Sequence, residues 1–585
     1  MVSRLAIRRY YNSTSVIQKI QTAVLGSKWN GEFERFIQLA GNTSQPIAFA
    51  YRADGKVYGF TLSADGTGNP DADVNSRLAQ LKNASGTIIG WQFIDAGSDS
   101  IENYDSAGKL LSIVDRNGRA LTFTQNAGGA ISTITEYVGQ QLAFVYDTQQ
   151  RISSIILPDG NPINYSYDSN NNLLAVTFPG GSAKNYHYED SRFPNALTGI
   201  TDERGVRYAT WTYDESGRAI SSEHAGGVDR HTLAFGANQT VVTDPLGTSR
   251  TYNFQTILGV VKNTGVSQLG GSGCGPAAEA LTYDANGNVS SRTDFNGKKT
   301  TYSYDLARNL ETSRTEGLSS AGAALPETRT ITTSWHPTWR LPVEVNEYAG
   351  ASASGNPLRR TQTAYDDKGN VTSRSVTDVA AGVTRTWTTS YTYSTVVPGL
   401  ILQKVEDGPR TDVTDSTVTE YYPHDEVCAG AALGTGRDKG CRGQVKRITN
   451  PLGQVTQFSR YNAHGQVEEI TDPNGVVTTL TYDLRQRLTS RSTAGETTAF
   501  QYDPVGQLTR LTQPDGSYIA YTYDGARRLT EVADNLGNRI AYTLDAAGNR
   551  TREDVRDPQG ALMKTLSRAY DALGRMQTLT GVAAE

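Results

Sequence analysis

The amino-acid sequence predicts an all-β protein: a long antiparallel array of β-hairpins that curls into a spiral shell, with little helix near the N-terminus. Three observations lead to this fold class. The dipeptide Tyr-Asp recurs 11 times, often with a step of 20 or 21 residues. Turn signals halve each period, which leaves room for two strands of about 5–6 residues. Only 37% of the 585 residues are hydrophobic, and this low fraction suits a twisted single layer better than a thick core.

The first hundred residues carry no clear repeat and have the only helical signal. From Thr14 to Leu25, the apolar residues Val16, Ile20 and Val24 are four apart, which predicts a helix. A second, weaker helix is predicted from Asp73 to Leu81. We therefore expect an irregular N-terminal region over residues 1–100.

The repeats occupy the rest of the chain. From Tyr461 onward the steps between equivalent positions are 21, 20, 21 and 21 residues. A fixed period of this size is typical of stacked supersecondary units, which bury their sheet faces side by side. The Tyr-Asp pairs begin at Tyr104, Tyr146, Tyr167, Tyr213, Tyr283, Tyr304, Tyr365, Tyr482, Tyr502, Tyr523 and Tyr570.

The letters of one period predict turn, strand, turn, strand. The Asp of each pair accepts a hydrogen bond from a backbone N–H two residues on, and a following Gly supplies the positive φ of the turn. Asn286-Gly287, Asn296-Gly297 and Asn474-Gly475 are strong hairpin signals. The segment Tyr518 to Tyr523 has the length and the Tyr content of a half-buried strand.

Four stretches differ in how regular the repeats are: the N-terminal region 1–100, degenerate repeats over 101–255, repeats with loop insertions over 256–441, and regular repeats over 442–585. Residues 318–360 and 396–441 are predicted to be long excursions. Because the pattern resumes promptly after each, we interpret them as insertions in one sheet rather than as domain linkers.

Charge and hydropathy exclude several classes of protein. The 55 basic and 60 acidic residues give a net charge of −5, which argues against a general binder of nucleic acid or membrane surfaces. No apolar run approaches the length of a transmembrane helix. Met1 to Gly26 has arginines but no unbroken apolar core, so no signal peptide is predicted.

Three cysteines are too few for a disulfide scaffold. Cys428 and Cys441 flank a Gly-rich stretch, and their spacing allows either a loop-closing disulfide or two reduced thiols. Cys274, in Gly-Ser-Gly-Cys-Gly, is predicted to be a free thiol.

The search for catalytic, cofactor and metal sites yields no candidate that we accept. His224 and His231 lie seven residues apart but lack further ligands, and His424 near Cys428 matches no zinc spacing. Asp71 to Asn75 imitates the start of a calcium loop but lacks its later Gly and Glu. Gly271 to Gly275 lacks the strand–helix context of a nucleotide loop. We predict no enzyme, no catalytic, cofactor-binding or metal residues, and no cofactor.

The repeated tyrosines allow two interpretations. Stacked at 20–21 spacing, they could form an aromatic ladder that binds sugar or peptide. We favour a packing ladder that holds strands in register through cross-strand pairs, each worth about 0.2–1 kcal/mol. The repeated aspartates are interpreted as turn residues rather than catalytic carboxylates.

The pattern Tyr-Asp-x-x-Gly-x-Leu/Val, a second turn ten residues on, and then Tyr-x-Tyr-Asp resembles the YD repeats of the Rhs family. The resemblance is strong over Tyr283 to Leu310 and Arg460 to Asp545. Arg8 to Ser13, followed by Gly26, Trp29 and Glu32, is similar to the region that precedes the first repeats in Rhs proteins.

The resemblance implies a function. Rhs, wall-associated, insecticidal toxin-complex and teneurin proteins share a spiral β-sheet shell, or β-cocoon. In the bacterial members the shell encloses a C-terminal toxin, used in interbacterial competition and often delivered by type VI secretion. The expected partners are therefore toxin cargo, its immunity protein and secretion spike or adaptor proteins, and the expected location is secreted or cell-surface associated. The first alternative is a wall-associated adhesin or carbohydrate-binding repeat protein. The second is an enzyme with a site in one excursion, 318–360 or 396–441.

The chain departs from the bacterial pattern near its ends. We find no self-cleavage motif of the type Asp-Pro-x-Gly-Leu, no toxin domain after the repeat at Tyr570, and no spike-adaptor domain before Met1. We therefore expect an excised shell fragment, a truncated gene product or a shell whose cargo is separate. A final strand without a neighbour would leave a sheet edge that favours dimerisation or aggregation.

Overall fold

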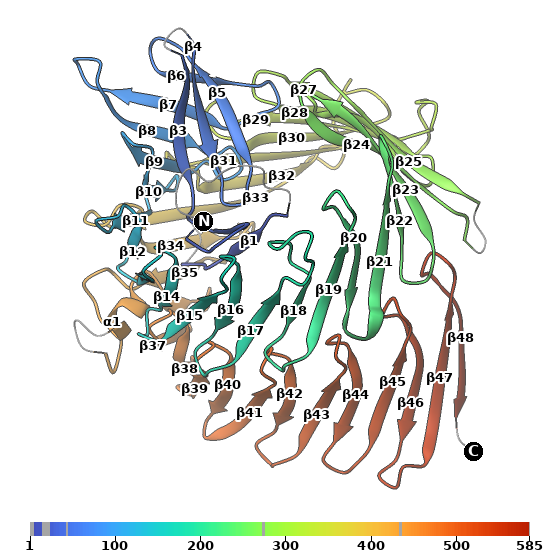
Figure 1. The fold of residues 1–585 in the computed structure, drawn as a ribbon. Helices are drawn as coiled ribbons and strands as arrows, with labels where there is room; N and C mark the ends of the chain where they lie inside the picture. The colour runs from blue at the N-terminus through green and yellow to red at the C-terminus, as the bar shows by residue number, and fades with distance from the viewer. Residues whose placement is uncertain (1–4, 14–23, 43–44, 272–274, 432–435, 584–585) are drawn as a thin grey trace.

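The computed structural model describes residues 5–13, 24–42, 45–271, 275–431 and 436–583. In these residues, 46 strands form one antiparallel sheet in which each strand pairs with the next strand along the chain. A separate two-stranded sheet joins β1 (Arg9–Tyr11) and β2 (Trp29–Gly31). The predicted fold class, an all-β hairpin array that winds into a spiral, is confirmed (Figure 1).

The sheet begins with a small closed ring. Phe36 forms a bridge to Lys109, so the first strand of the sheet, β3, meets the start of β10. The strands of this ring are β3 (Phe36–Asn42), β4 (Gln45–Tyr51), β5 (Val57–Leu62), β6 (Thr67–Pro70), β7 (Arg77–Lys82), β8 (Ile88–Ile94), β9 (Ile101–Asp105) and β10 (Leu110–Val114).

The sheet then runs along the front of the molecule in Figure 1 and turns at the right. Its strands there are β11 (Ala120–Gln125), β12 (Ile131–Glu136), β13 (Gln141–Tyr146), β14 (Ile152–Ile156), β15 (Pro162–Tyr167), β16 (Leu173–Thr177), β17 (Ala183–His187), β18 (Gly199–Thr201), β19 (Arg207–Tyr213), β20 (Ala219–His224), β21 (Val228–Phe235), β22 (Gln239–Thr243), β23 (Ser249–Ile257), β24 (Val260–Gln268) and β25 (Ala277–Tyr283). We call β11–β22 the front wall.

The sheet returns to the left behind the front wall, and we call this stretch the return wall (Figure 1). Its strands are β26 (Val289–Thr293), β27 (Lys299–Asp305), β28 (Leu310–Leu318), β29 (Arg329–Trp335), β30 (Pro342–Ala349), β31 (Arg359–Tyr365), β32 (Val371–Asp378), β33 (Val383–Tyr393), β34 (Ile401–Asp407) and β35 (Thr417–Tyr421).

A second pass follows, below the front wall in Figure 1. It consists of β36 (Val445–Thr449), β37 (Val455–Tyr461), β38 (Val467–Thr471), β39 (Val477–Tyr482), β40 (Leu488–Thr493), β41 (Glu496–Tyr502), β42 (Leu508–Thr512), β43 (Tyr518–Tyr523), β44 (Leu529–Asp534), β45 (Arg539–Leu544), β46 (Arg550–Arg556), β47 (Leu562–Tyr570) and β48 (Met576–Ala583). Among the described residues, β48 pairs only with β47.

Each repeat forms its hairpin by the same backbone geometry. Asp284 and Gly287 illustrate it: the Asp284 N–H donates to the Asn288 carbonyl, and the Gly287 N–H donates to the Asp284 carbonyl. Gly287 has a φ of 73°, so this is a three-residue loop whose last residue is left-handed. The Tyr before each turn pairs with the apolar residue six positions later, as Tyr283 does with Val289. The register of the two strands shifts between Thr282 and Tyr283. The motif Tyr-Asp-x-x-Gly-x-Leu/Val therefore encodes a hairpin with a bulge.

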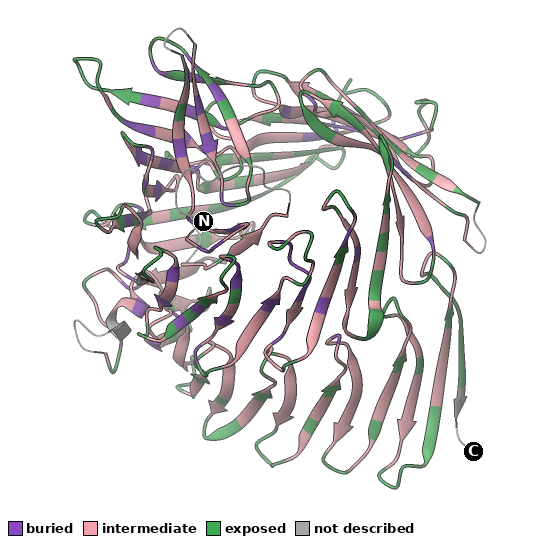
Figure 2. Ribbon diagram, in the orientation of Figure 1, coloured by how far each residue is buried: buried purple, intermediate pink, exposed green. Residues whose placement is uncertain are grey.

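The apolar core lies in the first part of the spiral. It includes Trp29, Phe60, Phe93, Ile134 and Val176 and extends from Leu25 to Leu197. Figure 2 shows buried residues gathered on the ring and front wall, whereas the second pass is mostly half-buried or exposed. Beyond residue 441, the described chain buries only two apolar side chains, Tyr461 and Ala526. The second pass is therefore a single layer that no other layer covers.

The described residues contain little helix, and none of it lies where the sequence predicts. The helix predicted from Asp73 to Leu81 is wrong: the chain turns and then forms β7, where Leu78 and Gln80 are buried on alternate positions, as in a strand. The helix predicted from Thr14 to Leu25 falls mainly outside the described residues. The described helices are the 3₁₀ turn Ala225–Gly227 and α1 (Gly436–Cys441), neither of them near the N-terminus.

The N-terminal region and the two excursions are more regular than we predicted. Residues 36–94 form β3 to β8 of the ring. Residues 318–360 contain β29 and β30, and residues 396–441 contain β34 and β35, all paired in the main sheet. Their Thr- and Val-rich strands pair as the others do, but their connections lack the Tyr-Asp turn by which we located repeats. No helix in the described part of the chain is long and apolar enough to cross a membrane.

Candidate functional site

Most Tyr-Asp repeat positions make hydrogen bonds that hold the sheet together. In five Tyr-Asp copies, and in the related pair Tyr188-Glu189, the tyrosine hydroxyl donates to a backbone carbonyl 15 residues earlier, at 2.6–3.0 Å. That carbonyl belongs to the first residue of the preceding strand, so each tyrosine joins its hairpin to the one before. This supports the packing interpretation of the ladder. The six tyrosines are Tyr146, Tyr167, Tyr188, Tyr304, Tyr482 and Tyr523.

The aspartate carboxylates are equally occupied. Oδ1 of Asp483 accepts the backbone N–H groups of Arg485 and Arg487, and Oδ2 accepts the Arg487 guanidinium at 2.6 Å. Burial alone would raise the pKa of Asp483, but these hydrogen bonds offset it and hold the pKa below its ordinary value. Seven other repeat aspartates make the same three contacts: Asp147, Asp168, Asp214, Asp284, Asp366, Asp545 and Asp571.

The N-terminal residues form a plug against the front wall. The plug comprises β1, β2 and the residues between Val24 and Phe36. Trp29 donates from Nε1 to the Tyr188 hydroxyl at 2.8 Å, and the Tyr11 hydroxyl bridges the front wall by donating to the Asn195 carbonyl and accepting the Leu197 N–H. The Trp29 ring also packs edge-on against Tyr186 at 4.9 Å between centroids. These contacts fix the plug to the front wall.

A seam of polar contacts joins the second pass to the front wall. We define the seam as the contacts between turns of these two stretches, which lie about 320 residues apart in sequence. Arg204 donates to the carbonyls of Asp524 and Gly525, across separations of 320 and 321 residues. Farther along, Thr248 donates to the Ala572 carbonyl, a separation of 324 residues.

The centre of the seam is a buried charge cluster. The carboxylates of Asp202 and Glu203 have side chains only 0% and 3% exposed. From the second pass, Arg527 lies 3.2 Å from Asp202 and Arg485 lies 3.3 Å from Glu203. Burial alone would raise the pKa of Asp202, but hydrogen bonds from Arg204 lower it, so the carboxylate stays ionised at neutral pH. Lys184 lies 4.0 Å from Glu203 and completes the cluster.

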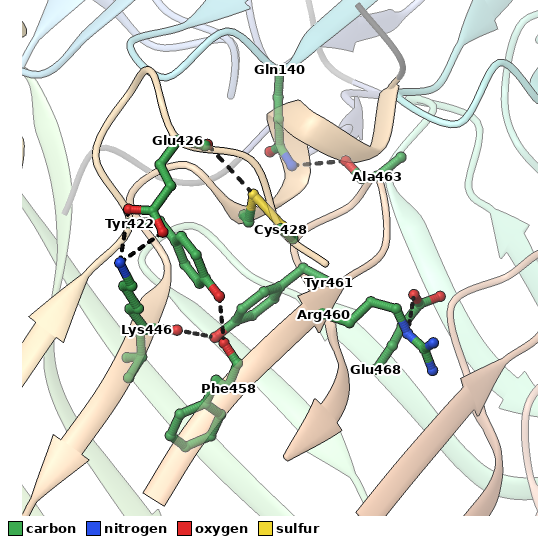
Figure 3. Close-up of a disulfide and its surroundings, with 12 residues drawn as sticks. Gln140, Tyr422, Glu426, Cys428, Lys446, Phe458, Arg460, Tyr461, Ala463 and Glu468 are labelled. Carbon is green, nitrogen blue, oxygen red and sulfur yellow. Dashed lines mark hydrogen bonds and ion pairs between the residues drawn. A yellow bond between two sulfur atoms is a disulfide. The ribbon is translucent and has the colours of Figure 1, made fainter. Parts of the chain in front are cut away.

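Cys428 and Cys441 form a disulfide with 5.9 Å between their Cα atoms. This settles the two alternatives that the sequence leaves open. Both residues are buried, together with Tyr422 and Tyr461, whose rings meet edge-to-face (Figure 3). Cys274, predicted to be a free thiol, lies outside the described residues.

The disulfide loop packs on both sides of the seam. A Cβ at Gly440 would clash with the Asn462 carbonyl, and just after the loop a Cβ at Gly443 would lie 3.2 Å from the Tyr137 hydroxyl of the front wall. Beside the loop, Gln140 donates from the front wall to the Ala463 carbonyl at 2.8 Å (Figure 3). The disulfide loop therefore stabilises the place where the second pass begins to run beneath the front wall.

The histidines and acidic residues singled out in the sequence do not gather into a metal site among the described residues. His224 and His231 each approach Asp229, at 3.7 and 3.6 Å, and no group of three or more metal-ligating side chains occurs among the residues described. His424 is 3.9 Å from Asp425. The segment that imitates a calcium loop is instead a contact between turns: Asn309 donates to the Ala72 carbonyl.

The comparisons with known proteins agree with the repeats. The RHS Repeat family matches residues 283–321, 461–499 and 502–539, and the Teneurin YD-shell family matches residues 47–228. The fold and these matches define a YD-repeat shell protein. The chain belongs to the Rhs/YD-repeat family.

Several solved structures are similar to the chain over most of its length. TcdB2-TccC3-TEV is 12% identical with a TM-score of 0.45, covering 98% of this chain and 32% of that chain. TcdB2-TccC3 without its hypervariable C-terminal region is 10% identical with a TM-score of 0.39, covering 97% and 36%. A Photorhabdus luminescens Tc holotoxin pore is 12% identical with a TM-score of 0.25, covering 92% and 35%.

The chain thus spans about a third of the length of these solved chains. A comparison with curated proteins found no match.

Proposed function

We propose that the chain is a structural, non-enzymatic segment of a shell that encloses a polypeptide toxin and carries it in interbacterial competition. The observation that carries this proposal is the bare single layer of the second pass. Its strands expose part of both faces, although a sheet of this length ordinarily packs one face on another layer. An enclosed polypeptide would cover the inner face and would be kept from solvent and proteases.

The partners proposed for this shell are the ones that the resemblance to Rhs proteins implies. They are a C-terminal toxin, its immunity protein, and spike or adaptor proteins of a delivery system such as type VI secretion. The Cys428–Cys441 disulfide supports a secreted or cell-surface location, since disulfides persist in oxidising compartments. The carbohydrate-binding alternative gains no support from the tyrosine ladder, because the hydroxyls that would meet a sugar bind backbone carbonyls.

Limited proteolysis tests the enclosure. The full chain is co-expressed with a candidate cargo domain and digested with thermolysin, and the cargo band is followed beside the same cargo alone. We expect the enclosed cargo to be cleaved at least tenfold more slowly. A cargo that is degraded as fast with the shell as without it contradicts the proposal.

A matched control separates enclosure from simple binding. The variant Asp202→Asn/Glu203→Gln removes two carboxylates of the seam without touching the inner face of the second pass. We expect the cargo to stay bound in a pull-down but to lose much of its protection. The opposite result would be a variant whose shell is cut by thermolysin at the seam while its cargo is cleaved as slowly as in the native shell. That result would place the cargo outside the shell.

A further inference from the structure

A cavity of about 140 Å³ lies between the N-terminal plug and the inner face of the ring and front wall. Its walls come from the plug, from the ends of β3 and β4, and from β10 to β15. It differs from the seam and from the inner face of the second pass, and none of the functions discussed above uses it. The structure thus has a concave site with walls from several elements, the common setting of small-molecule sites.

The floor of the cavity is apolar. Ile152 and Ile155 of β14 and Leu110 of β10 are almost completely buried, and Leu25 and Phe33 close the floor from the plug side. Phe144, Tyr146 and Ile131 add partly buried surface. A ligand resting here would bury hydrocarbon or aromatic surface, at about 25 cal/mol per Å².

Two of the arginines on the rim are neutralised by the protein itself. Arg52 binds both oxygens of Glu102 at 2.6 Å, and the Glu102 side chain is completely buried. Arg35 pairs with Glu102 and also, at 3.0 Å, with Glu32. These two guanidinium groups and two carboxylates balance, so they shape the wall without attracting a ligand charge.

The remaining rim charge is positive. Arg8, Arg9 and Lys109 line the cavity, and none of them has a carboxylate partner among the ion pairs of the described residues. Arg9 donates to the Tyr165 hydroxyl at 3.2 Å, which leaves its charge uncompensated. Glu34 is the one further carboxylate on the rim, and it accepts the Gly31 N–H. Lys56 also lines the cavity, but it lies 3.9 Å from Asp54, so three further cations face one carboxylate and the rim is net positive.

Lys109 is the best placed of these cations. It follows Gly108 at the bridge that closes the ring, and its ammonium rests against Gly129 in the turn between β11 and β12, because a Cβ built at Gly129 would overlap Nζ. Lys109 lines the cavity together with the apolar residues of the floor. An anion bound there would make a charge-assisted hydrogen bond in a partly desolvated place.

We propose that this cavity binds a small amphipathic carboxylate, with its anionic head at Lys109 and its hydrocarbon body on the floor formed by Ile152 and Ile155. Medium-chain fatty acids represent this ligand class. A neutral ligand of the same shape would gain the apolar contacts alone, and a cationic one would be repelled by the rim.

Isothermal titration of the full chain with decanoate tests the proposal, with decanol and decyltrimethylammonium as the neutral and cationic probes. We expect decanoate to bind with one site per chain, and both other probes to bind at least tenfold more weakly. Absence of decanoate binding, or equal binding of decanol, overturns the proposal.

Two variants test the placement of the ligand. Lys109→Met should weaken decanoate at least tenfold, and Ala130→Leu, which adds bulk at the cavity wall, should weaken decanoate and decanol alike. The matched control is Lys298→Met, at the same repeat position after Gly297 but on the return side of the sheet, which should leave affinity unchanged. Circular dichroism checks that each variant is folded. Equal affinities in Lys109→Met and the native chain contradict the proposal.

Discussion

Replacing Arg527 by methionine should loosen the seam between the front wall and the second pass. The Arg527 guanidinium lies 3.2 Å from the Asp202 carboxylate through two nitrogens, across 325 residues of sequence. The Asp202 side chain is fully buried, whereas that of Arg527 is 25% exposed. The pair is therefore intermediate between a surface ion pair and a buried one.

The expected magnitude follows from this burial. A hydrogen bond to a charged group contributes about 1.5–3 kcal/mol, and a solvent-exposed ion pair about 0–1 kcal/mol. Partial screening of Arg527 places the coupling at about 1–2 kcal/mol. Urea unfolding of Asp202→Asn, Arg527→Met and the double variant measures that coupling as a double-mutant cycle.

Arg528 supplies the matched control. It neighbours Arg527 in sequence, but its guanidinium binds Asp524 of its own turn at 2.8 Å. The cycle between Asp202→Asn and Arg528→Met should therefore give a coupling near zero. The reasoning is refuted if Arg527 couples to Asp202 by less than about 0.3 kcal/mol, or if Arg528 couples as strongly.

Three other predictions concern the repeats. Tyr482→Phe removes the hydroxyl that donates to the Val467 carbonyl at 2.8 Å, and the free energy of unfolding should fall by about 1 kcal/mol in urea titrations. Ala494 has a φ of 53° before Gly495 in a two-residue hairpin, so Ala494→Asn should raise the free energy of unfolding by about 0.5–1 kcal/mol, and a decrease would contradict the turn assignment.

The third concerns pH. Because folding lowers the pKa of Asp483 and other turn aspartates below 3.8, their stabilisation is present above that pH and is lost as the pH falls through the folded values. Stability measured by urea should be lower at pH 3 than at pH 6, and equal stabilities would contradict the assigned hydrogen bonds.

The hairpins are the part of the structure that the sequence predicts well. Asp483 and Tyr482 are local signals, because a turn needs only the residues within four positions of it. The prediction of a weak helix from Asp73 to Leu81 is wrong because the apolar pattern that suggested it covers only a few residues. The pairing of β7 with β6 and β8 makes this segment a strand. Tertiary pairing commonly overrides so weak a propensity.

The seam could not be predicted from the sequence. Asp202 and Arg527 are ordinary turn residues in their own repeats, and only the pitch of the spiral brings them together. That pitch depends on the summed twist of all the strands between them, which no local pattern reports. The Cys428–Cys441 pair is an intermediate case: its spacing allows a disulfide, but burial against Tyr461 appears only in the structure.

The central claim is that one continuous sheet winds until its second pass lies against its front wall. Cysteines at the Thr248–Ala572 contact test this most directly, in a chain that also carries Cys274→Ser. Thr248→Cys/Ala572→Cys should form a disulfide on mild oxidation, seen as a band shift on a non-reducing gel, whereas Thr248→Cys/Ala526→Cys should not, because the turn of Ala526 contacts Arg204 instead. Failure of the first pair to cross-link, or equal cross-linking of both pairs, would contradict the wound sheet.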